Sequence, residues 1–439
     1  MNRRGWQLRL TTLLRPFGSL AKTSSAKNAG WLYLLQFSNY VIPLVTVPYL
    51  VRVLGPSSYG EVGFGQGLAS YLAIGVNYGF DLSATRDISS VRSNALEVKR
   101  ISSAIWTAKL TLLILALGLL TALIVFVGKV GKEYAIMLIL FGIVIGNALF
   151  PTWLFQGLER MGFISVTHLV TRAAATAAIF VFVRSSNNAL QYAVILSSQW
   201  LLMGLVGVAL ATLRLGVYPS IAPWNQVRRA IIRGGAAFSA RALGGVYSAG
   251  NPFLLGLLSS PSTVGYYVAA EKLVRVAVGS LDPLTQALYP SFSRHAVGLN
   301  DDFNRTFRWV SKVMVAWGAA LGFFFLVGGH SLVKILYGVR FESSVVPLEV
   351  LGSECLFVAV SYCYGVLYML PMRKDAAFSG FIAVATAIDI VLALILVPKL
   401  GATGMAISVV ASEAIVALAT YFYAKVHMGR VREASIEVT

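Results

Sequence analysis

Apolar stretches of about 20 residues recur along almost the whole chain, and they limit its fold more than any other feature. Each is long enough to cross a bilayer, because about 20 helical residues at about 1.5 Å rise span about 30 Å. Only 12% of the residues are charged, whereas soluble domains carry about 25%. The sequence therefore predicts an all-α integral membrane protein with twelve transmembrane helices. We expect these helices at residues 30–52, 61–81, 102–127, 134–155, 163–183, 190–213, 232–257, 264–290, 309–330, 344–370, 376–397 and 401–424.

The connections between these stretches are short and leave no room for a soluble domain. Residues 1–28 do not show the pattern of a cleaved secretory signal, so we expect the first helix to stay in the mature protein. The turn at 54–60 resembles the turn at 258–266 in sequence, since both combine Pro, Ser, Gly and Tyr; we call this similarity the echo. Two hairpin turns of similar composition would also explain this echo. We expect two parallel six-helix halves, arranged as a basic segment at 1–28, bundles at 29–220 and 221–425, and a tail at 426–439.

Lys and Arg number 36 against 18 Asp and Glu, which gives a net charge of +18. An excess of this size suits an anionic partner such as nucleic acid, but the positions of the cations give another explanation. With the loops assigned alternately to two sides, 24 cations lie on the side of the N-terminus and 7 on the other. Because cytoplasmic loops carry the excess of Lys and Arg, we expect both termini in the cytoplasm and no nucleic-acid partner.

Five cations remain inside the predicted spans. An unpaired charge at the centre of a bilayer costs at least about 2.5 kcal/mol, so such residues need a partner or a hydrated cavity. Their distances from the ends of their helices place all of them near the middle of the membrane. We interpret them as lining a hydrated cationic lumen, with pairing between Glu271 and Arg275 at i and i+4 as the alternative for that pair. The five residues are Lys109, Arg172, Arg241, Lys272 and Arg275.

The acids inside the spans all lie in the second half of the chain, so the first half has no deep partner for its cations. For Glu349 and Glu354, a position near the outer interface with the carboxylate reaching water is an alternative to an internal site. The acids are Glu271, Asp282, Glu349, Glu354, Asp389 and Glu413.

Motifs for other chemistry are absent from the sequence. The four histidines are scattered without ligand spacing, which does not favour a metal site. No Gly-rich phosphate loop followed by Lys-Ser/Thr occurs, so we expect no ATP hydrolysis by this chain and no cofactor. Uphill transport would then need an ion gradient or a partner.

Several local patterns, in this order and at these helix boundaries, resemble the Wzx-type O-antigen flippases. These belong to the polysaccharide-transport branch of the superfamily that also contains the multidrug and toxin extrusion transporters. The patterns are Pro48-Tyr49-Leu50 through Leu54-Gly55 to Tyr59-Gly60, Ser83-Ala84-Thr85-Arg86-Asp87-Ile88-Ser89, Phe155-Gln156-Gly157-Leu158-Glu159-Arg160-Met161, Gly265-Tyr266-Tyr267-Val268-Ala269-Ala270-Glu271-Lys272-Leu273, Tyr289-Pro290-Ser291 and Gly401-Ala402-Thr403-Gly404-Met405-Ala406.

The resemblance implies two six-helix bundles in a V-shaped fold like that of the multidrug and toxin extrusion transporters. It also implies a substrate, an undecaprenyl-pyrophosphate-linked oligosaccharide that crosses from the cytoplasmic to the periplasmic leaflet of the bacterial inner membrane. The five cations would hold the pyrophosphate, because Arg and Lys both bind phosphate oxygens. We expect Asp389 and Glu413 to couple transport to H⁺ or Na⁺, with Asp282 and Glu271 as further candidates. Arg86 and Asp87 are gate candidates, for which an ordinary loop salt bridge is the alternative.

Two other functions remain open. A multidrug or cation antiporter of the same fold would carry cationic substrates, which a cationic lumen disfavours. A membrane polymerase of the same polysaccharide would need a catalytic loop on the outer face, where the loops are short. Besides membrane lipids and the lipid-linked glycan, the expected partners are a polysaccharide polymerase and a chain-length regulator.

Overall fold

The computed structural model describes residues 24–295 and 301–437, with the side chains of 40–235, 238, 250–294, 303 and 305–429. Every regular element in these ranges is helical. The elements are α2 (Ser24–Asn77), α3 (Phe80–Ser90), α4 (Ala95–Phe126), α5 (Gly128–Lys132), α6 (Tyr134–Leu149), α7 (Thr152–Gly157), α8 (Met161–Phe182), η1 (Ser186–Asn188), α9 (Ala189–Leu215), α10 (Trp224–Ala249), α11 (Asn251–Leu258), α12 (Pro261–Gly279), α13 (Asp282–His295), α14 (Asp301–Leu336), η2 (Val339–Ser344), α15 (Val345–Gly352), α16 (Glu354–Ser361), η3 (Tyr362–Met369) and α17 (Asp375–Glu437).

Two long helices each contain a reversal of the chain. Gly55 in α2 has φ 74° and ψ 175°, and Gly401 in α17 has φ 55° and ψ −126°. Positive φ is strained for a residue with a Cβ, so glycine is favoured at both turns. Among the described residues, eight helical stretches are long and apolar enough to cross a membrane. Two of these stretches contain the reversals and cross twice, so the eight stretches give ten crossings. The segments α10–α11 and α12–α13 supply two more, which agrees with the expected twelve.

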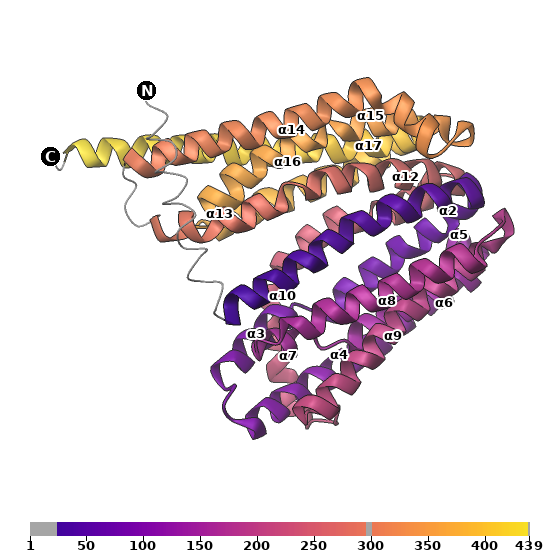
Figure 1. Cartoon of the computed structure of the whole chain (residues 1–439), viewed down its shortest axis with the longest axis horizontal. Helices are drawn as coiled ribbons and strands as arrows, with labels where there is room; N and C mark the ends of the chain where they lie inside the picture. The colour runs from indigo at the N-terminus through magenta and orange to yellow at the C-terminus, as the bar shows by residue number, and fades with distance from the viewer. Residues whose placement is uncertain (1–23, 296–300, 438–439) are drawn as a thin grey trace.

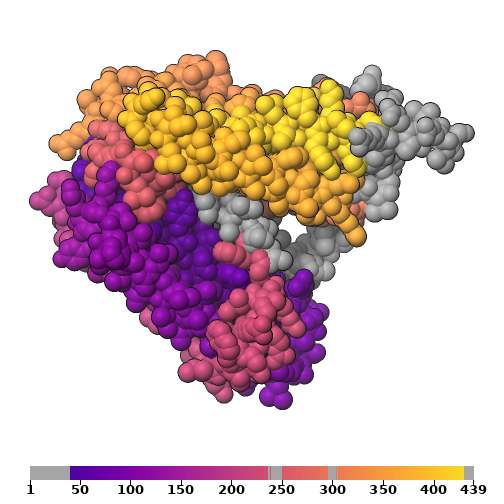
Figure 2. Space-filling model, turned by 180° about the vertical axis from the view of Figure 1, so that it is seen from behind, coloured from indigo at the N-terminus to yellow at the C-terminus, as the bar shows by residue number. Residues whose placement is uncertain are grey.

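The helices form two bundles that meet at one end and diverge toward the other (Figure 1). Elements α2 to α9 make the first bundle, and α11 to α17 make the second. The space-filling view shows the same separation (Figure 2). We call the end where the bundles meet, marked by Gly55 and Gly401, the closed end, and the end marked by α3 and α13 the open end. The V-shaped arrangement implied by the family resemblance is therefore present.

Two glycines allow the bundles to approach closely at the closed end. A Cβ at Gly60 would lie 1.8 Å from the carbonyl oxygen of Pro261, and one at Gly265 would lie 2.1 Å from that of Pro56. The contacts are reciprocal, since each glycine follows the proline of its own hairpin by four residues and meets the proline of the other. Reciprocal contacts are typical of a two-fold relation, so this contact supports the relation between halves that the sequence echo suggested.

Large apolar side chains on the outer faces of the bundles are exposed, including Ile114 (63%), Phe126 (84%) and Phe323 (67%). Such surfaces are expected where lipid is the solvent. The first turns of α10 pack against α3 and α4, and Val227 is buried in one cluster with Phe80 and Trp106. The segment that follows residue 220 thus begins on the first bundle before it reaches the second.

Candidate functional site

A cavity of about 390 Å³ lies between the two bundles. The first bundle contributes α2, α6, α8 and α9 to its wall, and the second contributes α11 and α12. Three of the five predicted cations line it: Arg172 from α8, and Lys272 and Arg275 from α12. Glu271 is the one acidic residue in the described lining. The lining therefore carries a net positive charge, contributed by both bundles.

Arg275 and Glu271 pair across one turn of α12. The Arg275 guanidinium donates to the Glu271 carboxylate at 2.7 Å, and the side chains are 46% and 9% exposed. The pairing that helical spacing suggested is thus present. Its partly exposed guanidinium lines the cavity.

Arg172 and Lys272 face the cavity from opposite bundles. The charge of Arg172 acts on Lys272, so the two cations repel each other across the lumen. An anion between them would remove this repulsion. Uncharged polar side chains, including those of Gln66, Ser70 and Gln199, complete the wall, and they can hydrogen-bond to hydroxyl groups of a ligand.

Lys109 does not line this cavity. It is only 2% exposed, and its Nζ donates to Asn77 Oδ1 at 2.9 Å. Asn77 Nδ2 in turn donates to Asn147 Oδ1 at 2.8 Å. Lys109 therefore belongs to a polar network inside the first bundle that joins α2, α4 and α6. The backbone of Arg241 is in α10, but its side chain lies outside the described residues.

Three acids of the second bundle interact electrostatically and are called the acidic cluster here, namely Glu354 on α16 and Asp389 and Glu413 on α17. The charge of Glu413 acts on both Glu354 and Asp389. Asp389 is 2% exposed, and its Oδ1 has no hydrogen-bond partner among the described residues. The charge of Glu354 also acts on Arg275. The acidic cluster is thus electrostatically linked to the cavity wall.

Glu354 was not among the predicted coupling residues, because a position near the interface was a comparable reading. Its place ten residues beyond the start of the predicted helix at 344–370 indicates a position inside the membrane, and this signal could have identified it. Among the described residues, no group of three or more His, Cys, Asp and Glu is placed to hold a metal ion.

Asp282 lies apart from these acids, at the first residue of α13. Its two carboxylate oxygens accept hydrogen bonds from the Tyr40 hydroxyl at 2.5 Å and the Tyr362 hydroxyl at 2.9 Å. Tyr40 is on α2 and Tyr362 begins the π-helical turn η3. Asp282 therefore joins the two bundles on the open-end side of the cavity. A carboxylate held by two hydroxyls is less suited to bind an ion than Asp389.

The two gate candidates differ in their contacts. Asp87 pairs with Arg233 of α10 at 3.4 Å, which links α3 to the segment between the bundles. Arg86 is exposed, and none of the ion pairs of the described residues includes it.

Cations of the first bundle bind carbonyl groups of the second at the closed end. Arg52 donates to the carbonyl of Leu336 at 2.9 Å and also to that of Ile335, at the last turn of α14. Lys129 donates to the carbonyl of Ser259 at 3.0 Å, just after α11. A cation at a helix C-terminus is stabilised by the helix dipole. The sequence placed both residues on the outer side but gave no sign of these partners.

A family model described as "Polysaccharide biosynthesis protein" matches residues 25–296, more than half of the chain. The chain belongs to this family. It is 30% identical over 400 residues to a putative O-antigen transporter of Escherichia coli (strain K12), and the match covers 90% of this chain and 95% of the relative. A putative O-antigen transporter of Shigella dysenteriae is 26% identical and covers 89% and 98%. The resemblance drawn from the sequence patterns is thereby confirmed.

Solved structures show the same fold at low sequence identity. An inward-facing multidrug resistance MATE family transporter of the MOP superfamily matches with a TM-score of 0.68 at 13% identity, covering 90% of this chain and 96% of that structure. Lipid II flippase MurJ in an inward closed conformation matches with a TM-score of 0.69 at 11% identity, covering 90% and 87%. An outward-facing MATE family transporter gives 0.54 at 14% identity, covering 91% and 96%. The predicted fold class is therefore confirmed.

Proposed function

We propose that this protein is a flippase that moves undecaprenyl-pyrophosphate-linked oligosaccharide repeat units of an O-antigen or a similar surface polysaccharide from the cytoplasmic to the periplasmic leaflet. The observation that carries the proposal is the cavity between the bundles, to which Arg172 and Lys272 contribute cations from opposite sides. Guanidinium and ammonium groups both bind phosphate oxygens. The names of the two transporter relatives support this substrate class.

The polar lining fits the rest of the headgroup. Gln66, Ser70 and Gln199 offer donors and acceptors to sugar hydroxyls. Only the headgroup has to pass between the bundles, because the hydrocarbon tail can remain in the bilayer. A cavity of about 390 Å³ is within the range of about 300–1,000 Å³ typical of small-molecule sites, so it holds the pyrophosphate and the first sugars, while further sugars extend toward the open end.

Transport then follows from rocking the bundles about their contact. With both termini in the cytoplasm of a bacterium, the open end faces the cytoplasmic leaflet, and the chain is in the state that accepts substrate. Release on the other side requires the contacts of Arg52 and Lys129 at the closed end to break. Binding of the anionic headgroup favours whichever state brings the cations of the two bundles closer to it.

The acidic cluster is the proposed site of ion coupling. A buried carboxylate with an oxygen that lacks a hydrogen-bond partner among the described residues is costly when ionised, so Asp389 gains most from a proton or Na⁺. Glu413 and Glu354 add negative charge close by. Uptake of a cation there changes the charge of the second bundle and shifts the balance between the two states. The substitution Asp389→Asn is expected to remove the dependence of flipping on the ion gradient, measured in proteoliposomes with and without an imposed gradient.

The main test uses a strain that lacks the protein. We expect lipid-linked repeat units to accumulate in the cytoplasmic leaflet, and the wild-type chain to restore their transfer. The double variant Arg172→Glu with Lys272→Glu is expected not to restore it, whereas the control Arg184→Glu, an exposed cation outside the cavity, should. Equal restoration by the double variant would show that the cationic cavity does not bind the substrate.

The same strain separates the other functions. Units that cross but stay monomeric would indicate a polysaccharide polymerase. A strain with neither defect would favour a multidrug or cation antiporter of the same fold, whose cationic substrates the net positive lining would repel.

A further inference from the structure

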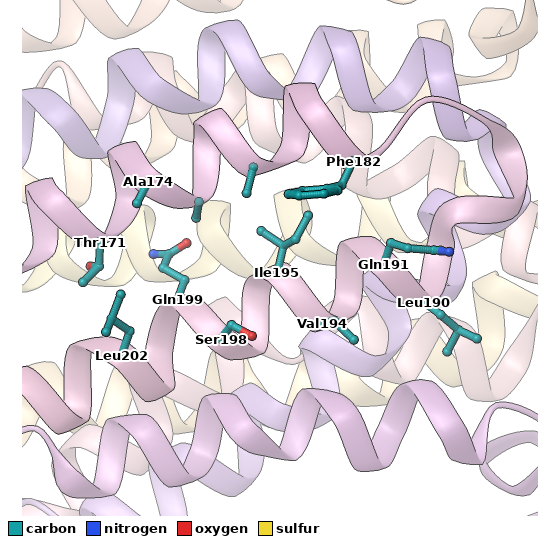
Figure 3. A pocket seen from close by; sticks show the side chains of 12 residues that line it. Thr171, Ala174, Phe182, Leu190, Gln191, Val194, Ile195, Ser198, Gln199 and Leu202 are labelled. Atoms are coloured by element: carbon teal, nitrogen blue, oxygen red, sulfur yellow. The ribbon is translucent and has the colours of Figure 1, made fainter.

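A second groove, of about 600 Å³, lies on the outside of the first bundle between α8 and α9 (Figure 3). Alanines and one phenylalanine of α8 face apolar residues of α9 across it. The side chains concerned are Ala174, Ala178 and Phe182 on α8, and Leu190, Val194 and Leu202 on α9.

The apolar wall of this groove is open to the surroundings of the protein. Phe182 is 63% exposed, and Val194 and Leu202 are each 47% exposed. Exposed apolar side chains on a membrane-spanning bundle face lipid, not water. The alanines leave a channel because a longer side chain at their positions would fill the space between the helices.

The groove adjoins the cationic cavity. Ala175 and Gln199 line both spaces, and Figure 3 shows Gln199 reaching from α9 toward α8. Arg172 lies one helical turn before Ala175 and lines the cavity but not the groove. The seam between α8 and α9 thus has a charged compartment on its inner side and an apolar compartment on its outer side, with Ala175 and Gln199 in the wall of both.

We propose that the groove holds the hydrocarbon chain of a polyisoprenyl diphosphate, which leaves the cavity past Ala175 and Gln199 while its phosphates lie against Arg172 and Lys272. The proposal rests on the function proposed above and adds the path of the tail. The adjacency of the two compartments selects this occupant. An apolar molecule would gain nothing from the cations, and a soluble anion would gain nothing from the groove, whereas an anionic lipid gains from both.

The test compares matched alanine substitutions on α8. In the groove variant, Ala174→Leu with Ala178→Leu, two isobutyl groups fill the channel. In the control variant, Ala173→Leu with Ala177→Leu, the same groups are added one position earlier, at exposed alanines that do not line the groove. Equal melting temperatures of the two full-length variants in detergent establish that both are folded.

The probe is a polyisoprenyl diphosphate with a photoreactive group in its tail, used with the purified protein in vesicles. We expect wild-type and control proteins to be labelled on peptides of α8 and α9, and the groove variant to be labelled about tenfold less, the factor that corresponds to about 1.4 kcal/mol of binding. Inorganic pyrophosphate should compete equally in the variants and in wild type, because the cationic cavity is unchanged.

Three results would overturn the proposal. Labelling of wild type on other helices would place the tail elsewhere and leave the proposed function intact. Equal competition by phosphatidylglycerol would mean that the groove holds ordinary bilayer lipid. Wild-type protein that neither binds the probe nor responds to pyrophosphate would contradict the proposed function itself, and the tail path with it.

Discussion

The contacts of Arg52 and Lys129 should hold the closed end together. Both side chains belong to the first bundle and donate to carbonyl groups at helix ends of the second. Replacing both by methionine keeps most of the side-chain length and removes the charges. The double variant Arg52→Met with Lys129→Met is therefore expected to shift the protein toward a state that is open at this end.

The size of the shift follows from the number and the exposure of the contacts. A cation at an exposed helix C-terminus contributes about 0.3–1 kcal/mol. Arg52 binds two carbonyls of one helix end, which places it toward the top of this range. Together the two cations should contribute about 1–2 kcal/mol, which corresponds to a change of about 5–30-fold in the ratio of the two states.

Labelling of a cysteine inside the cavity measures this ratio. Ser70→Cys places a thiol in the cavity wall, and the two native cysteines, Cys355 and Cys363, are buried. A membrane-impermeant maleimide added on the side of the closed end should label Ser70→Cys about 5–30 times faster when Arg52 and Lys129 are replaced.

The matched control is Lys132→Met, which removes an exposed cation from the same segment as Lys129. Its labelling rate should stay within about twofold of the parent, since surface charges contribute little. An unchanged rate in the double variant, or an equal increase in the control, would refute the view that these carbonyl contacts hold the closed end together.

Three further predictions concern single positions. Gly60→Ala should lower the melting temperature in detergent, because its Cβ would meet the backbone of α12 at 1.8 Å, and such overpacking costs about 1–3 kcal/mol. The control Gly75→Ala adds a Cβ that has nothing within 4 Å, so it should be neutral or stabilising by up to about 1 kcal/mol. Asn77→Ala should destabilise the first bundle by about 1.5–3 kcal/mol, the range for a hydrogen bond to a charged group, because it removes the acceptor of Lys109 Nζ. Burial raises the pKa of the Glu133 carboxyl, so the folded chain holds this proton more tightly than the unfolded chain does. The contribution of the protonated carboxyl to stability therefore falls as the pH rises above about 4.3. Glu133→Gln should remove this part of the pH dependence of the melting temperature.

The sequence predicted the crossings and the turns well, for physical reasons. A bilayer requires apolar runs of nearly fixed length, so composition alone reveals each span. The reversals at Gly55 and Gly401 follow from a residue type that tolerates positive φ. The echo between the hairpins also had a structural meaning, since Gly60 and Gly265 make reciprocal contacts.

The direction in which each side chain points, toward the cavity, the bundle interior or the lipid, was harder to predict. Lys109 and Arg172 have similar predicted depths, yet Arg172 lines the cavity while Lys109 contacts Asn77 inside the first bundle. Depth along a helix fixes height in the membrane but not direction. In a soluble helix the apolar stripe supplies the direction, whereas here lipid-facing and bundle-facing sides are both apolar. The partners of Arg52 could not be predicted either, because they are backbone carbonyls that carry no sequence signal.

One helix, α12, connects the parts that alternating access has to coordinate. Near its start Gly265 packs on Pro56, in its middle Lys272 faces the cavity, and beyond its end Asp282 holds Tyr40. Two of these three points, at Gly265 and at Asp282, are contacts with α2. The seam between α2 and α12 therefore stays packed from the closed end past the cavity, even though the bundles diverge elsewhere. A substrate therefore cannot enter the cavity through this seam in this state, and the groove between α8 and α9 adjoins the cationic wall on another side of the first bundle.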